Sequence, residues 1–240
     1  MSKKVYIVGA KRSPIGSFLG TLKDVHPQEM GSQVLKALLE ETKVPVDKIS
    51  EVIVGNILSA GLGQGIARQI SVKSGIPEAI PAYSLNMLCG SGMKAILNAF
   101  MGIQSGLSEI VVAGGVESMS YAPYLVTGKV RSGNKMGNME MVDHMVYDAL
   151  TDAFGNMHMG ITAENIANKH NLSREEQDKF AYESQAKAIK AVDEGKFKDE
   201  IVPIVIKTRK GDIVFEFAFI NCFYGFCLRF VSESKSHKSS

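Results

Sequence analysis

The chain has 240 residues, 45% of them hydrophobic and 22% charged, a composition typical of a folded globular protein. Its formal net charge of +2 at pH 7 is too small to indicate a nucleic-acid or membrane-surface partner. Three cysteines do not make a disulfide framework, and the short apolar run at residues 5–10 does not fit a signal peptide. The sequence therefore predicts a cytoplasmic protein with reduced thiols, no membrane span and no nucleic-acid partner.

Strand-like and helix-like stretches alternate through the first 116 residues. Such alternation predicts an α/β fold in which a mostly parallel sheet is flanked by helices. The expected strands are residues 4–10, 51–57, 82–88 and 109–114, and the expected helices are residues 30–42, residues 66–73 and a third one from Gly90. The third helix places five large apolar residues on one face: Met93, Ile96, Leu97, Phe100 and Met101.

The rest of the chain is expected to form three parts. Residues 117–200 lose the alternation and predict an inserted loop domain that ends in two helices, the second one with a capping box from Ser173 to Glu176. Residues 201–216 are rich in β-formers and predict a return to the core. The segment after Glu216 is rich in Phe and then polar, which indicates an aberrant tail. The predicted domains are residues 1–116, 117–200, 201–216 and 217–240.

Cys89 lies where the strand pattern of residues 82–88 gives way to the third helix, which opens with Gly90, Ser91 and Gly92. The first N–H groups of a helix have no intrahelical acceptor and favour an anion. A thiolate is the nucleophilic form of cysteine, and the same N–H groups would serve as an oxyanion hole for a carbonyl under attack. A second interpretation stays open, because most free cysteines are small buried hydrophobes.

Several stretches resemble the thiolase family, in particular its short-chain biosynthetic branch, the acetyl-CoA C-acetyltransferases. Together they cover about residues 1–216, and Ser13 stands where threonine is usual. The stretches are Val5–Gly16, Asn86–Gly92, Ala113–Ser120 and His158–Asn165. The resemblance implies a thiolase-like α/β fold, of which this chain is the N-terminal βαβαβ half with an inserted loop domain and with the second half absent.

The resemblance also implies a chemistry for Cys89. This thiol would take an acetyl group from acetyl-CoA or acetoacetyl-CoA as a thioester, and a second acetyl-CoA would then form or cleave a carbon–carbon bond. The resemblance implies that no metal and no prosthetic group is used. Coenzyme A is part of the substrate. His158 and Met159 match positions along the CoA arm, although His158 would equally cap a helix that begins at Gly160.

Two other segments have two interpretations each. The stretch Ser120–Met141, with Lys129, Arg131 and Lys135, is similar to a loop through which related enzymes form tetramers, so a homo-oligomer, dimer or tetramer, is expected; a solvated loop is the alternative. The glycines of Gly61–Gly65 invite a phosphate-loop interpretation, but their spacing fits no phosphate motif and favours a tight turn.

The resemblance predicts further groups in the second half, namely an Asn, a His in G-H-P and a second Cys. None is found, since His26-Pro27 lacks the preceding glycine and Cys222 and Cys227 lack a glycine-rich turn. We therefore expect acyl acceptance at Cys89 without an efficient carbon–carbon step, and a bare apolar helix face. Two alternatives are a non-catalytic fragment that associates with full-length thiolase subunits and a related condensing enzyme such as a ketosynthase. His158-Met159-Gly160 and the long insertion argue against the ketosynthase.

Overall fold

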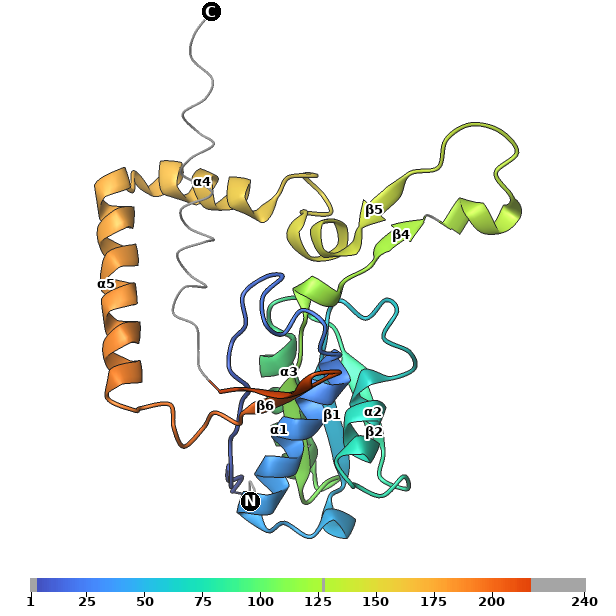
Figure 1. Ribbon diagram of the computed structural model, residues 1–240, viewed down its shortest axis with the longest axis vertical. Coiled ribbons are helices and arrows are strands. Elements are labelled where there is room, and N and C mark those ends of the chain that lie inside the picture. Colours follow the sequence, from blue (N-terminus) through green and yellow to red (C-terminus); the bar gives the residue numbers. More distant parts are fainter. Residues whose placement is uncertain (1–3, 127, 217–240) are drawn as a thin grey trace, which may run out of the picture.

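The computed structural model describes residues 4–126 and 128–216. Figure 1 shows a core that contains a parallel sheet, with an arm and two long helices extending from it. Its helices are α1 (Pro27–Thr42), α2 (Ile66–Lys73), α3 (Ser91–Ser105), α4 (Met159–His170) and α5 (Arg174–Asp193). Its strands are β1 (Glu51–Gly55), β2 (Ala82–Leu85), β3 (Val111–Gly115), β4 (Tyr124–Val126), β5 (Met141–Asp143), β6 (Ile204–Thr208) and β7 (Gly211–Phe215).

The sheet of the core has the strand order β2-β1-β3, and both strand pairs are parallel. Helix α2 connects β1 to β2, and α3 connects β2 to β3, which is the predicted βαβαβ unit. In a parallel sheet all carboxyl ends lie at the same edge, where loops carry functional groups. Here Gly55 lies between Leu85 and Gly115 in register at that edge.

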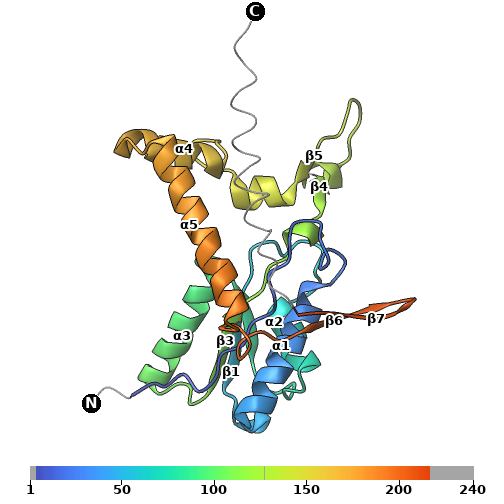
Figure 2. The ribbon, with the colours of Figure 1, turned by 60° about the vertical axis from the view of Figure 1, so that its left-hand side comes forward.

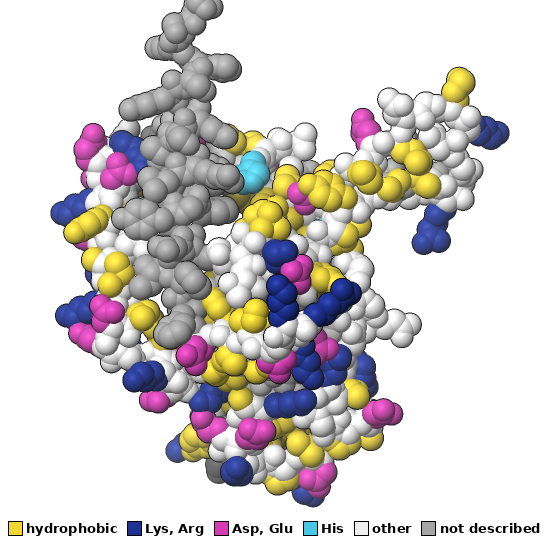
Figure 3. Space-filling view, in the orientation of Figure 1, with side chains coloured by type: hydrophobic (Ala, Val, Ile, Leu, Met, Phe, Trp, Pro, Cys, Tyr) yellow, Lys and Arg dark blue, Asp and Glu magenta, His cyan; other side chains and the backbone are white. Residues whose placement is uncertain are grey.

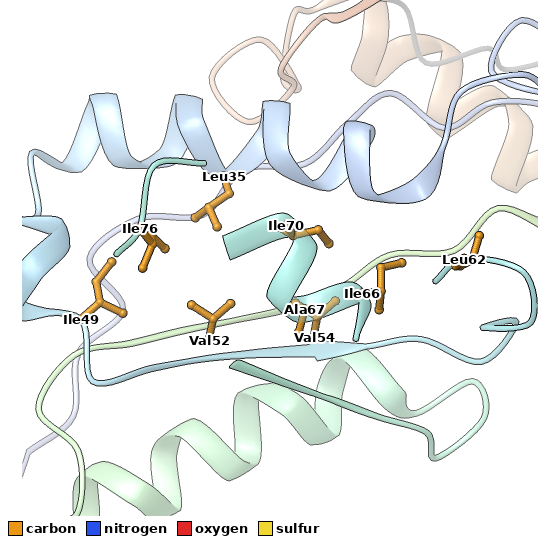
Figure 4. Close-up of a cluster of buried hydrophobic side chains, with 9 residues drawn as sticks. All are labelled: Leu35, Ile49, Val52, Val54, Leu62, Ile66, Ala67, Ile70 and Ile76. Carbon is orange, nitrogen blue, oxygen red and sulfur yellow. The ribbon is translucent and has the colours of Figure 1, made fainter. Parts of the chain in front are cut away.

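Helices cover both faces of the sheet. Figure 4 shows Val52 and Val54 of β1 on the side of α1 and α2, where they pack among other aliphatic side chains. Ile53 points to the opposite face and packs against Ala95 and Ala99 of α3. This alternation is the reason that β1 is apolar from Val52 to Val54, as expected for a strand buried on both faces.

Helix α3 forms as predicted, but its large apolar residues do not face the sheet. Small residues, Ala95 and Ala99, make the contact with β1, so that the helix approaches closely. The five residues from Met93 to Met101 named above lie on the other side and are between 46% and 76% exposed. The expectation of a bare apolar helix face is met by this helix.

The strand expected at residues 4–10 is wrong, because this segment pairs with no strand among the described residues. Tyr6, Ile7 and Val8 are all at least 70% exposed. The strand β3 is the edge of the sheet, and a cavity separates it from the chain at residues 11–18. A strand pattern gives β-propensity, but a strand needs a neighbour within hydrogen-bonding distance.

The parts outside the core are more exposed. The strands β4 and β5 form the root of an arm (Figure 1), and Figure 3 shows hydrophobic and charged side chains interspersed over it. The helix α5 begins with the predicted capping box, in which Ser173 and Glu176 bond reciprocally. The hairpin of β6 and β7 returns to α1, where Ile204 and Phe215 are buried. The domain boundaries stay a prediction, and the tail after Glu216 lies outside the described residues.

Candidate active site

Cys89 is exposed at the turn that joins β2 to α3. Leu88 adopts a left-handed backbone conformation with φ of 48°, which costs about 1–2 kcal/mol for a residue with a Cβ atom. The buried Ser91 holds this turn: its Oγ accepts from the N–H of Met87 at 2.8 Å and donates to the carbonyl of Leu88 at 2.6 Å. The thiol is thus on a rigid turn and open to solvent, and the interpretation of Cys89 as a buried hydrophobe is wrong.

Of the three N–H groups predicted to face an anion, two are already bonded. The N–H of Gly90 donates to Met87 O at 3.1 Å, and the N–H of Ser91 donates to Leu88 O at 2.9 Å. The expectation of three unpaired amides is therefore wrong for Gly90 and Ser91. Within residues 4–126 and 128–216, the N–H of Gly92 has no acceptor. The N-cap Gly90 makes no side-chain cap bond, so this end of α3 keeps donor capacity.

Three glycines bring the start of α3 onto the carboxyl edge of the sheet. A Cβ atom on Gly55 would lie 2.4 Å from the carbonyl carbon of Ser91 and 2.6 Å from the nitrogen of Gly92. A Cβ atom on Gly115 would lie 3.2 Å from Cα of Gly92. Backbone packs directly on backbone here, and the position of the Cys89 turn depends on the absence of these side chains.

Glu117, two residues after β3, binds the amides of the loop after β1. Its carboxylate accepts from the N–H of Ile57 at 2.8 Å, from the N–H of Leu58 at 3.0 Å and from Asn56 Nδ2 at 3.0 Å. Desolvation of the carboxyl group raises the pKa of Glu117 above its ordinary value, and the two backbone N–H groups oppose this rise. The loop that follows the central strand is therefore fixed by a carboxylate.

A pair that the sequence pattern did not predict consists of the buried His144 and the exposed Asp148. His144 is 6% exposed, and its Nδ1 lies 2.5 Å from a carboxylate oxygen of Asp148. An electrostatic interaction with His144 acts to lower the pKa of Glu117, and it is smaller than the opposing desolvation. The spacing i,i+4 was a usable signal, but it lies in a stretch without clear helical periodicity. No set of three metal-ligating side chains is brought together within the described part of the chain.

His158 is the N-cap residue of α4. Its Nδ1 accepts from the N–H of Gly160 at 3.0 Å, and the hairpin that joins Thr151 to His158 holds its backbone. The capping interpretation is confirmed, with α4 starting at Met159 rather than at Gly160. Met159 follows in the first turn and is 39% exposed. A contact of either side chain with CoA stays a prediction.

The structure bears on both segments for which the sequence left two interpretations. Gly61, Gly63 and Gly65 all have a positive φ, which confirms the tight turn ahead of α2. Residues 131–140 are exposed throughout, as a solvated loop requires, and the role of this arm in assembly is untested.

A cavity of about 480 Å³ lies between residues 11–18, α1 and the edge strand β3. Its lining includes neither Cys89 nor His158, and its floor is made of core side chains such as Leu35 and Val52. We therefore attribute it to the gap between β3 and the unpaired N-terminal segment rather than to a substrate site.

Fold and site together define a class: an α/β protein that presents an exposed cysteine where a parallel strand turns into a helix. The sequence model described as "Thiolase, N-terminal domain" matches residues 5–218. The chain belongs to the thiolase family.

Relatives and a solved structure agree with this assignment. The chain is 51% identical over 209 residues to an acetyl-CoA acetyltransferase of Chromobacterium violaceum and 49% identical over 208 residues to that of Pseudomonas aeruginosa. Each match covers 87% of this chain and 53% of the relative. A crystal structure of the Bacillus anthracis acetyl-CoA acetyltransferase superimposes with a TM-score of 0.83 at 40% identity, covering 88% of this chain and 53% of that one. The chain thus spans about half the length of the curated relatives it matches. None of the helices in the described ranges is long and apolar enough to cross a membrane.

Proposed function

We propose that this chain carries the acyl-accepting half of an acetyl-CoA C-acetyltransferase, with Cys89 as the nucleophile. The observation that supports it is an exposed thiol on a rigid turn, directly before a helix whose N-cap makes no side-chain cap bond. The names of the relatives add the substrate class, acetyl-CoA.

In the proposed step, the Cys89 thiolate attacks the carbonyl carbon of acetyl-CoA. The new carbon–sulfur bond to Cys89 forms as the bond to the CoA sulfur breaks, and CoA leaves as a thiolate that takes up a proton. No electron is lost or gained. The negative charge that develops on the carbonyl oxygen is stabilised by the N–H of Gly92, while the N–H groups of Gly90 and Ser91 keep the turn in shape.

His158 and Met159 are proposed to contact the CoA arm from the start of α4. The step needs neither a metal nor a prosthetic group. A cytoplasmic location and a homodimer or homotetramer are further parts of the proposal.

The carbon–carbon step is not assigned to the described residues. Cys89 is the sole cysteine among them, and no second thiol there can remove a proton from the α-carbon of acetyl-CoA. General base catalysis of this kind typically contributes about 10²–10⁴ in rate. We therefore expect formation of the acetyl-enzyme to be measurable in this chain, and acetoacetyl-CoA turnover to be impaired.

Mass spectrometry of the chain after exposure to acetyl-CoA tests the proposal. We expect one acetyl group on Cys89, none on that position in Cys89→Ser, and release of one CoA thiol per adduct. Acetylation spread over exposed lysines, equal in the wild type and in Cys89→Ser, would refute the proposal. Peptide mapping separates the two results.

The second candidate function is a non-catalytic fragment that associates with full-length thiolase subunits. The exposed apolar face of α3 favours it, because such a face can be covered by another chain. Co-purification with a complete thiolase, together with an unlabelled Cys89, would support this candidate over the first.

A further inference from the structure

The Cys89 turn leads into a helix whose start rests on the last residues of two neighbouring strands. Gly55 ends β1 and Gly115 ends β3, and the two are paired in register. Figure 2 shows α3 beside both strands. The backbone of Ser91 and Gly92 packs directly on the two glycines. The place of the turn therefore depends on how the two strand ends are held relative to each other.

Side-chain hydrogen bonds tie the two strand ends together just beyond these glycines. Asn56 is 4% exposed, and its Nδ2 donates to the carbonyl of Val116 and to the carboxylate of Glu117, both at 3.0 Å. The same carboxylate accepts from the N–H groups of Ile57 and Leu58. We refer to these four hydrogen bonds as the Asn56–Glu117 bridge. The bridge joins the segment after β1 to the segment after β3.

We propose that the Asn56–Glu117 bridge positions the Cys89 turn for acyl transfer, because it sets the separation of the strand ends on which the start of α3 rests. Neither Asn56 nor Glu117 is assigned a contact with the substrate, so both are positioning residues. The inference rests on the proposed function of Cys89. It deepens that function by naming what keeps the sulfur and the N–H of Gly92 in one geometry.

Contact of backbone with backbone passes a shift of either strand end directly to the turn. A Cβ atom on Gly115 would lie 3.2 Å from Cα of Gly92, so no side chain lies between them to take up a displacement. The N–H of Gly92 is the donor to the developing negative charge in the proposed step. A misplacement of about 1 Å can lower the rate of an enzymatic step by about a hundredfold. Hydrogen bonds to a carboxylate are about twice as strong as neutral ones, which suits the bridge to this task.

The same two strands carry another carboxylate contact at their opposite ends. Glu51 is the first residue of β1, and its carboxylate accepts from the hydroxyl of Ser108 at 2.8 Å, just before β3 begins. Glu51 is paired in register with Val111 and lies about 13 Å along the strand from Gly55. A substitution of Glu51 is therefore a matched control, of the same chemical kind and on the same strands but far from the turn.

The rate of acetylation of Cys89 at several acetyl-CoA concentrations tests the bridge in the full chain, at a temperature where urea titration shows each variant to be folded. We expect Glu117→Ala and Asn56→Ala each to lower the rate at saturating acetyl-CoA by about ten- to a hundredfold. The half-saturating concentration should stay unchanged, because the bridge is not assigned a contact with CoA. Glu117→Gln keeps one acceptor oxygen and should lie between Glu117→Ala and the wild type, and it carries the test if Glu117→Ala does not fold. Glu51→Ala should react like the wild type.

Alkylation of Cys89 by iodoacetamide separates this inference from the proposed function, because it needs no acetyl-CoA. We expect alkylation of Glu117→Ala to be at least about threefold slower than that of Glu51→Ala. If the wild type is alkylated but never acetylated, the proposed function fails, and slower alkylation of Glu117→Ala still supports the bridge. Wild-type rates of alkylation and acetylation in the folded Glu117 and Asn56 variants would overturn the inference. Equal slowing in Glu51→Ala would also overturn it, because any loosening of the two strands would then have the same effect.

Discussion

The helices α3 and α4 differ in how their N-terminal backbone N–H groups are capped. At α4 the side chain of His158 accepts the N–H of Gly160, so the helix end is capped by its own chain. At α3 the equivalent side chain is missing, and Ser91 turns backward to bond Met87 and Leu88 instead. A helix N-terminus can bind an outside anion only where the chain leaves a backbone N–H unused, as it does at Gly92 within the described residues.

The largest effect is expected from Gly55→Ala, which would displace the N-terminus of α3 from the sheet. The new Cβ would lie 2.4 Å from the backbone of Ser91, and backbone atoms cannot rotate away as a side chain can. We expect a loss of about 3 kcal/mol in the free energy of unfolding and slower alkylation of Cys89 by iodoacetamide.

Gly114→Ala is the matched control, since a Cβ on the neighbouring strand would meet nothing within 4 Å. It should change the free energy of unfolding in urea by less than about 0.5 kcal/mol. Equal effects of the two variants would mean that the contact between β1 and α3 does not position the thiol.

The second prediction concerns the turn itself. Ser91→Ala removes two hydrogen bonds and leaves the N–H of Met87 without its acceptor. For a residue that is 4% exposed, we expect about 2 kcal/mol of destabilisation. Because the left-handed Leu88 depends on the same bonds, the acetylation of Cys89 should slow as well. Unchanged acetylation in a destabilised variant would separate the stability of the turn from its role at the site.

The sequence predicts those elements whose formation depends on residues close together in the chain, and it fails for those that depend on distant residues. Residues 66–73 form a helix with the predicted bounds, because helical spacing and a glycine turn are local signals. The strand at residues 4–10 fails, because its formation depends on a neighbour far away in the chain. Residues 82–88 lose their last part to the turn, which the side chain of Ser91 stabilises from the start of the helix.

The same distinction applies to the site. Cys89 and its glycines are adjacent in sequence, so the junction is readable from the pattern. The sequence does not predict which backbone N–H groups lack an acceptor. This depends on the hydrogen bonds of the turn, including the one that the Ser91 side chain donates back to Leu88. The contact of Glu117 with the loop at Ile57 joins residues 60 apart, and only the parallel pairing of β1 and β3 brings them together.

The third prediction sharpens the comparison from the side of α4. His158→Ala removes the cap and should cost about 1 kcal/mol, whereas His158→Asn keeps an acceptor for the N–H of Gly160 and should restore the stability. If His158 also contacts CoA, the acetylation of Cys89 should stay slow in His158→Asn at limiting acetyl-CoA. Full recovery of the acetylation rate in that variant would reduce His158 to a cap.

The smallest expected effect concerns the backbone N–H groups that donate to the carboxylate of Glu117. In the loop after β1 the carboxylate of Glu117 accepts two backbone N–H groups, and burial raises its pKa above the ordinary value for a glutamate. A carboxyl group whose pKa is raised by folding stabilises the folded state in its protonated form. Its contribution to the free energy of unfolding is full below its pKa in the unfolded state and declines as the pH rises through its pKa in the folded state.

The free energy of unfolding of the wild type should therefore fall relative to that of Glu117→Gln as the pH rises from about 4 to about 7. Urea titrations at several pH values measure this difference, with Glu109→Gln, an exposed residue just before β3, as control. A difference that changes in the opposite direction would mean that the N–H groups of Ile57 and Leu58 outweigh burial, and the loop amides would then bind a charge as strongly as we expect the end of α3 to do.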